Sequence, residues 1–354
     1  MVRIFAACPR YIQGPGAAAQ LADIARSIGP TAVIVIDAHV RGLIGPSLLA
    51  GFGTADRIIE FAGEITLERV DAMAKNCRDA AFAVVVAIGG GKALDAGKAV
   101  ARRLALPVIT VPTIASTDAP ASRGIAIYDD EHRLVRVEQL DSNPAAVVVD
   151  TAILAAAPEH FLRCGIGDAV AKKFEAEAAF NAGALNKHGT RPLQAGLIAA
   201  DGCYRLLRRH GAGAMAAAAR GKPDEDFEAA VEACFLLSAL GFENTGLSMA
   251  HSLTRGLVKA RGAKDAPHGY HVGYGLLVQF AVEARDRAEV EDMRGFLIQV
   301  GLPSTLAELG MPAPAGDEIA GIAQLTMDSP HIGNLPRPID ASDIANAIKL
   351  VEAL

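Results

Sequence analysis

Residues 84–95 read Val-Val-Val-Ala-Ile-Gly-Gly-Gly-Lys-Ala-Leu-Asp, an apolar run that passes through three consecutive glycines into a helix-like pattern. The apolar run predicts a strand buried on both faces, and the N–H groups that open the following helix have no partner within that helix. They also carry the positive end of the helix dipole, so they attract anions. We therefore predict that Gly89, Gly90 and Gly91 let a cofactor diphosphate approach the backbone. The alternative, a tight turn, usually needs only one glycine.

Apolar, β-branched runs recur through the first 150 residues and alternate with helical stretches. They cover residues 31–37, 81–88, 107–112 and 145–150. Strands that are apolar on both faces and separated by amphipathic helices are typical of a parallel sheet covered on both sides. We expect residues 1–150 to form a doubly wound, Rossmann-like α/β domain that binds a nucleotide.

The composition and the apolar spacing of the sequence change after residue 150. Alanine-rich stretches at 168–181, 192–209 and 226–242 carry apolar residues at helical spacing, and no β-branched strand run follows. This pattern predicts an all-α domain over residues 151–354. Because open α/β sheets bind ligands at the carboxyl ends of their strands, we expect the active site to lie in the cleft between the two domains.

Composition narrows the class of protein. The 354 residues are 51% hydrophobic and carry a formal net charge of −6, with no basic, aromatic-studded stretch, which argues against a nucleic-acid partner. No apolar run approaches the roughly 20 residues of a membrane span and no apolar leader opens the chain, so we expect a cytoplasmic protein. The five cysteines are scattered without a CxxC pair, which argues against a disulfide framework or a thiolate zinc cluster.

Asp37 ends an early apolar run and has two interpretations. Its carboxylate would accept hydrogen bonds from the adenosine ribose of NAD and repel the 2′-phosphate of NADP, or it would cap the helix that follows. The spacing leaves both open. The glycine loop itself departs from the GxGxxG pattern, and Ala93 follows Lys92 where a nucleoside triphosphatase needs Ser or Thr.

Four further motifs accompany the glycine loop, and the combination is more specific than any one of them. They are Pro-Thr-Ile-Ala-Ser-Thr-Asp-Ala-Pro at 112–120, Gly-Ile-Gly-Asp-Ala at 165–169, Ala-His-Ser at 250–252 and His-Gly at 268–269. Through these motifs nearly the whole chain resembles the NAD-dependent, zinc-containing branch of the iron-containing (group III) alcohol dehydrogenases, to which glycerol dehydrogenases belong. The resemblance implies oxidation of glycerol or a related vicinal diol to the hydroxyketone, by hydride transfer to NAD from a zinc-bound alkoxide. It also implies a homo-oligomer, an octamer or a smaller even-numbered assembly.

The same resemblance assigns site residues. Asp168, His251 and His268 match the three metal ligands, with zinc as the expected metal and iron or another divalent ion as alternatives, and Asp118 would contact the substrate. The residues that would surround NAD are Asp37, Gly91, Lys92, Ala93, Leu94, Asp95, Thr113, Ile114, Ala115, Ser116, Ser122, Gly124 and Tyr128. A carboxylate and two imidazoles, with one position left open, are the donors that catalytic zinc prefers.

Considered singly, these residues also have structural interpretations. Asp168 precedes an apolar-periodic stretch and would serve as a helix N-cap. His251 lies in a small-residue stretch where a hydrogen-bonded core histidine is the commoner case. Asp118 precedes Ala-Pro and suits a turn. The metal assignment therefore rests on the resemblance.

Two neighbouring residues have predicted roles outside the ligand set. His271 is a candidate to support the ligands, and as a fourth ligand it would favour iron over zinc. Lys172, like Lys173, is expected to be a solvent-facing charge.

Three other functions fit parts of the pattern. Glycerol-1-phosphate dehydrogenase and dehydroquinate synthase resemble this architecture, but both need cationic side chains for a phosphorylated substrate, and the sequence places no dense Lys/Arg cluster beside Asp168 or His268. Dehydroquinate synthase also carries Glu where this chain has Asp168. A metal-stabilised assembly protein without turnover is the non-enzymatic alternative.

Overall fold

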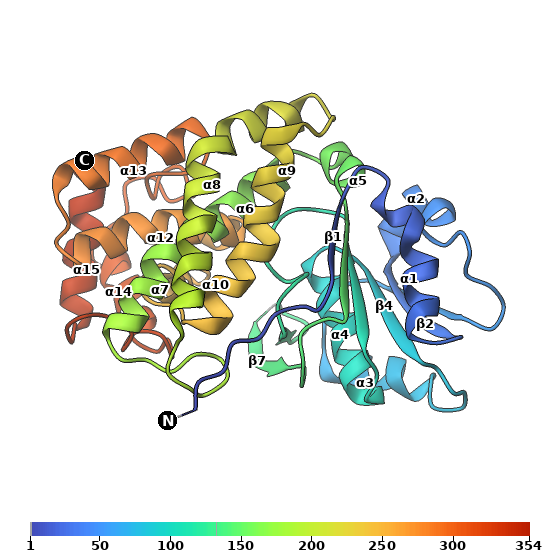
Figure 1. Cartoon of the computed structure of the whole chain (residues 1–354). Helices are drawn as coiled ribbons and strands as arrows, with labels where there is room; N and C mark the ends of the chain where they lie inside the picture. The colour runs from blue at the N-terminus through green and yellow to red at the C-terminus, as the bar shows by residue number, and fades with distance from the viewer. Residues whose placement is uncertain (1, 132) are drawn as a thin grey trace. The chain divides into compact units, whose positions relative to one another are not determined.

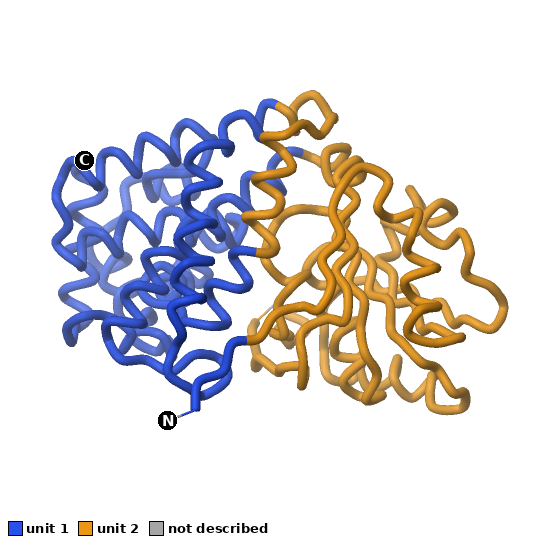
Figure 2. The backbone as a smooth tube through the Cα atoms, in the orientation of Figure 1, with its two compact units in different colours: residues 1–5, 159–216, 237–354 blue, residues 6–158, 217–236 orange. Residues whose placement is uncertain are grey.

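A computed structural model describes residues 2–131 and 133–354. The chain forms two compact units, coloured separately in Figure 2. The sheet unit consists of Ala6–Pro158 and Ala217–Leu236. The helical unit consists of Glu159–Ala216 and Leu237–Leu354, with the N-terminal residues up to Phe5. The chain therefore returns to the sheet unit after residue 216, which a single boundary at residue 150 does not describe.

The sheet unit is built on six parallel strands (Figure 1). Their spatial order is β1 (Tyr11–Gly14), β8 (Ala146–Asp150), β5 (Val108–Pro112), β4 (Val84–Gly89), β2 (Ala32–Asp37) and β3 (Arg57–Phe61). All pairs are parallel, as the apolar runs predict. Because β4 pairs with β2 on one side and β5 on the other, Asp37, Gly89 and Pro112 lie together at one edge of the sheet.

The four inner strands, β2, β4, β5 and β8, are apolar on both faces because helices cover both. Alternate residues of β2 and β4 enter two separate cores. Val33, Val35, Val85 and Ala87 pack with α3 (Leu67–Lys75) and α4 (Gly91–Leu104). Ile34, Ile36, Val84, Val86 and Ile88 pack with α1 (Leu21–Ile28) and α2 (Ala38–Leu48). The doubly wound α/β prediction is confirmed.

A two-stranded antiparallel sheet, β6 (Gly124–Tyr128) and β7 (Leu134–Gln139), was not anticipated from the sequence. It is joined to α4 by two buried side chains. Asp95 accepts a hydrogen bond from the Ala126 N–H at 2.9 Å, and Lys98 donates to the Gly124 carbonyl at 2.9 Å. Lys98 also pairs with Asp95 at 3.0 Å, so this buried charge is compensated.

The returning segment contains α9 (Glu225–Glu232), and polar contacts attach it to the sheet unit. Gln13 of β1 donates to the Glu228 backbone carbonyl at 2.9 Å and to its carboxylate at 2.7 Å. Thr151, the first residue of α5 (Thr151–Ala156), donates to the other carboxylate oxygen of Glu228. These contacts explain why a segment from the alanine-rich half belongs with the sheet.

The C-terminal half is helical, as its alanine-rich texture predicts. Its elements are α6 (His160–Val170), α7 (Lys172–Asn181), α8 (Gln194–Ala219), the π-helical η2 (Ala233–Leu237), α10 (Ser238–Asn244), α11 (Met249–Leu257), the 3₁₀ turn η3 (Ala263–Asp265), α12 (His268–Val282), α13 (Arg287–Gln299), α14 (Gly316–Thr326) and α15 (Ala341–Glu352). The five cysteines are free thiols. In the described part of the chain, no helix combines the length and apolar character that crossing a bilayer requires.

Candidate metal and dinucleotide sites

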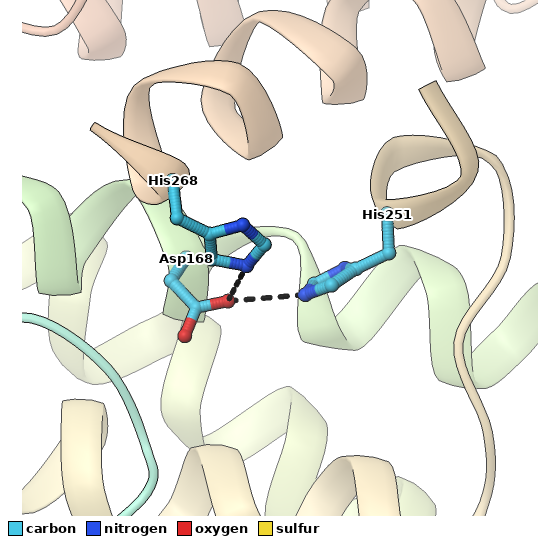
Figure 3. Close-up of side chains that lie close together, drawn as sticks. All are labelled: Asp168, His251 and His268. Atoms are coloured by element: carbon cyan, nitrogen blue, oxygen red, sulfur yellow. Dashed lines mark hydrogen bonds and ion pairs between the residues drawn. The ribbon is translucent and has the colours of Figure 1, made fainter. Parts of the chain in front are cut away.

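Three side chains from three helices of the helical unit meet at one point (Figure 3). Asp168 comes from α6, His251 from α11 and His268 from the first turn of α12, and their ligand atoms all lie within 4.8 Å of one another. Asp168 Oδ1 is 3.1 Å from His251 Nε2 and 3.9 Å from His268 Nε2. The structure thus brings together the three residues that the resemblance assigns as metal ligands.

Two glycines allow α6 and α12 to approach closely enough to form this cluster. A Cβ on Gly269 would lie 1.8 Å from the Cys164 carbonyl oxygen, and a Cβ on Gly167 would lie 2.2 Å from the Gly269 carbonyl oxygen. Both distances are far inside van der Waals contact, so neither position tolerates a side chain. Because Gly167 and Gly269 adjoin Asp168 and His268, this backbone contact sets the spacing of the two ligands.

The structural alternative for Asp168 is wrong. Asp168 does not cap a helix but lies inside α6 near its C-terminal end, with 2% of its surface exposed. Burial alone would raise the pKa of its carboxyl group, but the charge of Lys172, together with the adjacent His251, outweighs burial and holds the pKa well below its usual range. The carboxylate is therefore ionised and able to bind a cation.

Lys172 is not solvent-facing, contrary to the prediction. It is 1% exposed, and its Nζ lies 2.7 Å from Asp168 Oδ1 and 3.0 Å from His251 Nε2. The ammonium also lies 5.3 Å from the centre of the Phe242 ring. One helical turn separates Lys172 from Asp168, and the buried carboxylate accounts for the burial of the lysine, because each needs an opposite charge inside the protein.

Glu175 supports His251 from the side opposite the cluster. Its buried carboxylate is 2.5 Å from His251 Nδ1 and accepts backbone N–H groups of Ser248 at 2.8 Å and His251 at 2.9 Å. Burial would raise the pKa of Glu175, but attraction to His251 prevails and lowers it. A carboxylate on one ring nitrogen turns the other toward a metal and makes it a better ligand.

His268 is the most accessible member, with 45% of its side chain exposed. Desolvation of the ring, to which the nearby ammonium of Lys172 adds, lowers its pKa to about 4. The imidazole is neutral at pH 7, as a metal ligand must be. The donor set of the cluster, one carboxylate oxygen and two imidazole nitrogens, fits a catalytic divalent metal that keeps one position open.

His271 does not belong to this donor set. It is buried on α12, and its Nε2–H donates to the Ala263 carbonyl oxygen at 2.7 Å. Burial lowers its pKa, so the ring is neutral. Its hydrogen bond ties the start of α12 to η3.

The glycine turn lies between β4 and α4, as the sequence predicts, but the surroundings of the three glycines differ. Gly89 has φ +145°, and a Cβ there would lie 2.7 Å from the Ala93 Cβ and 2.9 Å from the Asp37 Cβ. A Cβ on Gly90 would lie 2.7 Å from the end of the Ile114 side chain. Only Gly91 has ordinary room, with its nearest contact at 3.5 Å. Backbone conformation and packing therefore account for Gly89, whereas a Cβ on Gly90 would meet only the flexible end of one side chain.

The start of α4 offers unpaired donors beside this turn. Gly90 is the N-cap residue and provides no side-chain hydrogen bond, so the first N–H groups of a 14-residue helix are uncapped. Thr113, which follows β5, donates its N–H to the Gly89 carbonyl at 3.0 Å. Its buried Oγ1 has no hydrogen-bond partner in the described residues. A buried hydroxyl of this kind is a group that a bound ligand would satisfy.

Asp37 caps α2, so the second interpretation of this residue holds in the structure. Its Oδ1 accepts the N–H groups of His39 and Val40, both at 3.0 Å. Cap and ribose ligand are compatible roles, because a carboxylate has a second oxygen. The position of Asp37 beside Gly89 follows from the pairing of β2 with β4.

Other residues assigned to NAD have defined places in the sheet unit. Asp95 and Gly124 take part in the contacts between α4 and β6. Burial, together with the charges of Asp95 and Glu64, raises the pKa of Tyr128 to about 12. Lys92 is exposed and paired with Glu64, and Ser122 is buried. Asp118 is half-buried, and its carbonyl accepts the N–H of Ala121 at 3.2 Å.

Known proteins resemble this chain over nearly its full length. A family model described as iron-containing alcohol dehydrogenase matches residues 8–151. A glycerol dehydrogenase of Pseudomonas putida is 36% identical over 349 residues, which cover 98% of this chain and 96% of that protein. The chain belongs to the iron-containing alcohol dehydrogenase family. A crystal structure of a probable glycerol dehydrogenase from Sinorhizobium meliloti shares the fold with a TM-score of 0.93 at 34% identity, covering 99% of both chains.

A second relative differs in the substrate that its name gives. A glycolaldehyde reductase of Halobacterium salinarum is 36% identical over 331 residues, which cover 93% of this chain and 91% of that protein. Membership of the family makes this dehydrogenase an oxidoreductase that acts on alcohols, as the resemblance implies.

Sequence reasoning missed two residues that contact the candidate metal ligands, Lys172 and Glu175. A signal was present, because Asp168, Lys172 and Glu175 are spaced four and three residues apart and would share one helical face. The apolar residues around them make that face a buried one. A charged stripe on a buried face points to a polar site rather than to solvent.

Proposed function

We propose that this dehydrogenase oxidises glycerol or a related vicinal diol to the hydroxyketone, with NAD as hydride acceptor and zinc as the metal. The cluster of Asp168, His251 and His268 carries the proposal, because an alcohol bound beside it would meet a three-ligand centre with an open position. Two adjacent hydroxyl groups suit such a centre better than one, which favours a diol.

The residues of the chain have distinct tasks in this proposal. Asp168, His251 and His268 would hold the metal, which when bound supplies the Lewis acidity that makes a hydroxyl proton easier to remove. Glu175 keeps the proton of His251 on Nδ1, so that Nε2 presents its lone pair to the cluster. The neutral state of His268 preserves a second lone pair.

The cofactor would be held by the edge of the sheet where β2, β4 and β5 end. The uncapped N–H groups of α4 suit a diphosphate, and the room at Gly91 lets it approach. The second oxygen of Asp37 suits ribose hydroxyls and repels a 2′-phosphate, which favours NAD over NADP. The hydroxyl of Thr113 supplies a further polar group.

We further propose that Asp118 contacts the substrate, where it would orient a hydroxyl group or accept its proton. Its support is the motif at 112–120 and its place in the loop after β5. An even-numbered homo-oligomer, up to an octamer, and a cytoplasmic location complete the proposal. The oligomer rests on the sequence resemblance, and the location rests on the apolar pattern of the sequence.

Purified enzyme, NAD and a panel of alcohols test this function through the absorbance of NADH. Glycerol, 1,2-propanediol and 2,3-butanediol should give NADH, chelation should abolish it, and zinc should restore it. Glycolaldehyde with NADH tests the reaction that the Halobacterium relative is named for. If none of the three diols gives NADH, the proposed substrate class is wrong, and turnover after complete metal removal would exclude the metal role. A preference for glycerol 1-phosphate would favour the phosphorylated-substrate alternative.

A further inference from the structure

Lys172 contacts the same two atoms that would hold a metal. Its Nζ is 2.7 Å from Asp168 Oδ1 and 3.0 Å from His251 Nε2, and these two atoms are themselves 3.1 Å apart. Only 2% of the lysine side chain is exposed, so the ammonium is enclosed with its partners. This contact differs from an ordinary surface ion pair, because both partners belong to the candidate ligand set.

The lone pair of His251 Nε2 cannot serve the lysine and a metal together. The Glu175 carboxylate lies 2.5 Å from Nδ1 and can only accept, so in the neutral ring that a metal needs, Nδ1 carries the proton and the single lone pair is on Nε2. That lone pair accepts one hydrogen bond from Lys172 or coordinates one metal ion. Asp168 Oδ1 has more than one lone pair, so the conflict arises at His251.

The charges around the cluster also indicate that Lys172 and a metal compete. Asp168 and Glu175 are two buried carboxylates, and Lys172 is the buried cation that touches the first of them. A divalent metal would compensate both carboxylates and would be repelled by an ammonium a few ångströms away. The lysine therefore stabilises the ligand set without metal and opposes metal uptake.

From these contacts we propose that Lys172 is a competing cation, which holds Asp168 and His251 in place in the metal-free enzyme and must leave His251 when the metal enters. Lys172 is the first residue of α7, and its side chain has four flexible carbons, so the ammonium can move away from His251. The consequence is a site that binds its metal weakly and exchanges it readily. This inference rests on the proposed metal site.

The neighbouring lysine provides a matched control. Lys173 is on the same helix but pairs with Asp201 at 2.9 Å and Glu177 at 3.6 Å, away from the ligand set. The variants Lys172→Met and Lys173→Met remove the same charge and keep a similar side-chain length. They therefore separate an effect on the cluster from a general effect of losing a positive charge.

Zinc affinity of the chelator-stripped full-length protein tests the inference, measured by competition with a chromophoric chelator. We expect Lys172→Met to bind zinc at least about tenfold more tightly than the wild type, and Lys173→Met to match the wild type within about twofold. Thermal melting gives a second readout. Without metal, Lys172→Met should melt below the wild type, and added zinc should raise its melting temperature by more.

The possible outcomes separate the two proposals. Unchanged or weaker zinc binding by Lys172→Met would overturn the competition and leave the metal site standing. Absence of zinc binding by every protein would overturn the metal site and the competition with it. Zinc binding by Lys172→Met but not by the wild type would support both. If Lys172→Met does not fold, Lys172→Gln removes the charge while keeping a donor for Asp168, and the same change in affinity is expected.

Discussion

The glycine turn of the sheet unit and the ligand cluster of the helical unit differ in how much of the chain each requires. The turn needs the end of one strand and the start of the next helix, and its neighbours Asp37 and Pro112 follow from parallel pairing. The cluster needs α6, α7, α11 and α12 in their final packing. A local site leaves a readable pattern in the sequence, whereas a dispersed site leaves only separate residues with several meanings.

The largest effect is expected when a ligand of the dispersed site is removed. We expect His251→Ala to lose bound metal and to lower kcat/KM by more than about 1,000-fold, because no other residue of the cluster replaces Nε2. Metal content by elemental analysis and turnover in the NADH assay measure the effect. A His251→Ala enzyme with full metal content would show that the ligand set is wrong.

Within the local site, the first and the third glycine of the turn should differ in their effect on stability. Gly89→Ala combines positive φ with Cβ contacts of 2.7 and 2.9 Å, and we expect it to lower the free energy of unfolding by about 2–4 kcal/mol. Gly91→Ala has room and should change stability by less than about 1 kcal/mol.

The cofactor readout completes the test of the two glycines. If Gly91 is bare because a diphosphate approaches it, Gly91→Ala should raise the KM for NAD by about tenfold while leaving denaturant unfolding nearly unchanged. The two variants thus distinguish a glycine required by the fold from one required by the ligand. Equal loss of stability in both would erase that distinction.

Glu175 tests whether the dispersed site depends on its supporting residue. Glu175→Gln keeps the shape but weakens the hold on His251 Nδ1, and we expect metal affinity to fall by about 10–100-fold. The loss should be smaller than for His251→Ala, since all three ligand atoms remain. Zinc competition is the measurement, and wild-type affinity in Glu175→Gln would argue against a role of this carboxylate in orienting the ligand.

The smallest expected effect concerns the two roles of Asp37. Asp37→Ala removes the cap of α2 and should lower stability by about 1 kcal/mol, whereas Asp37→Asn keeps an oxygen for the cap and should remain near the wild type. Both variants should lose discrimination between NAD and NADP, measured as the ratio of kcat/KM values. Unchanged discrimination in both would leave Asp37 as a cap alone.

The sequence by itself determined the parallel α/β half, the helical half and the place of the glycine turn. Strand runs, helix periodicity and turn glycines depend on interactions within a few residues, so they are visible in the order of amino acids. The antiparallel pair β6 and β7 and the return of residues 217–236 to the sheet unit left weaker signals, because they depend on long-range contacts such as Lys98 with Gly124 and Gln13 with Glu228.

The tertiary structure decided the environment of the candidate metal ligands and of the charged residues beside them. From local pattern Asp168 was a helix cap and Lys172 a solvent-facing charge, and family resemblance alone named the three ligands. Their proximity depends on α6 crossing α12 at Gly167 and Gly269, which no short stretch of sequence encodes. Burial then gives Asp168, Lys172 and Glu175 their roles, because charges enclosed together must compensate one another, whereas the same charges in water need not.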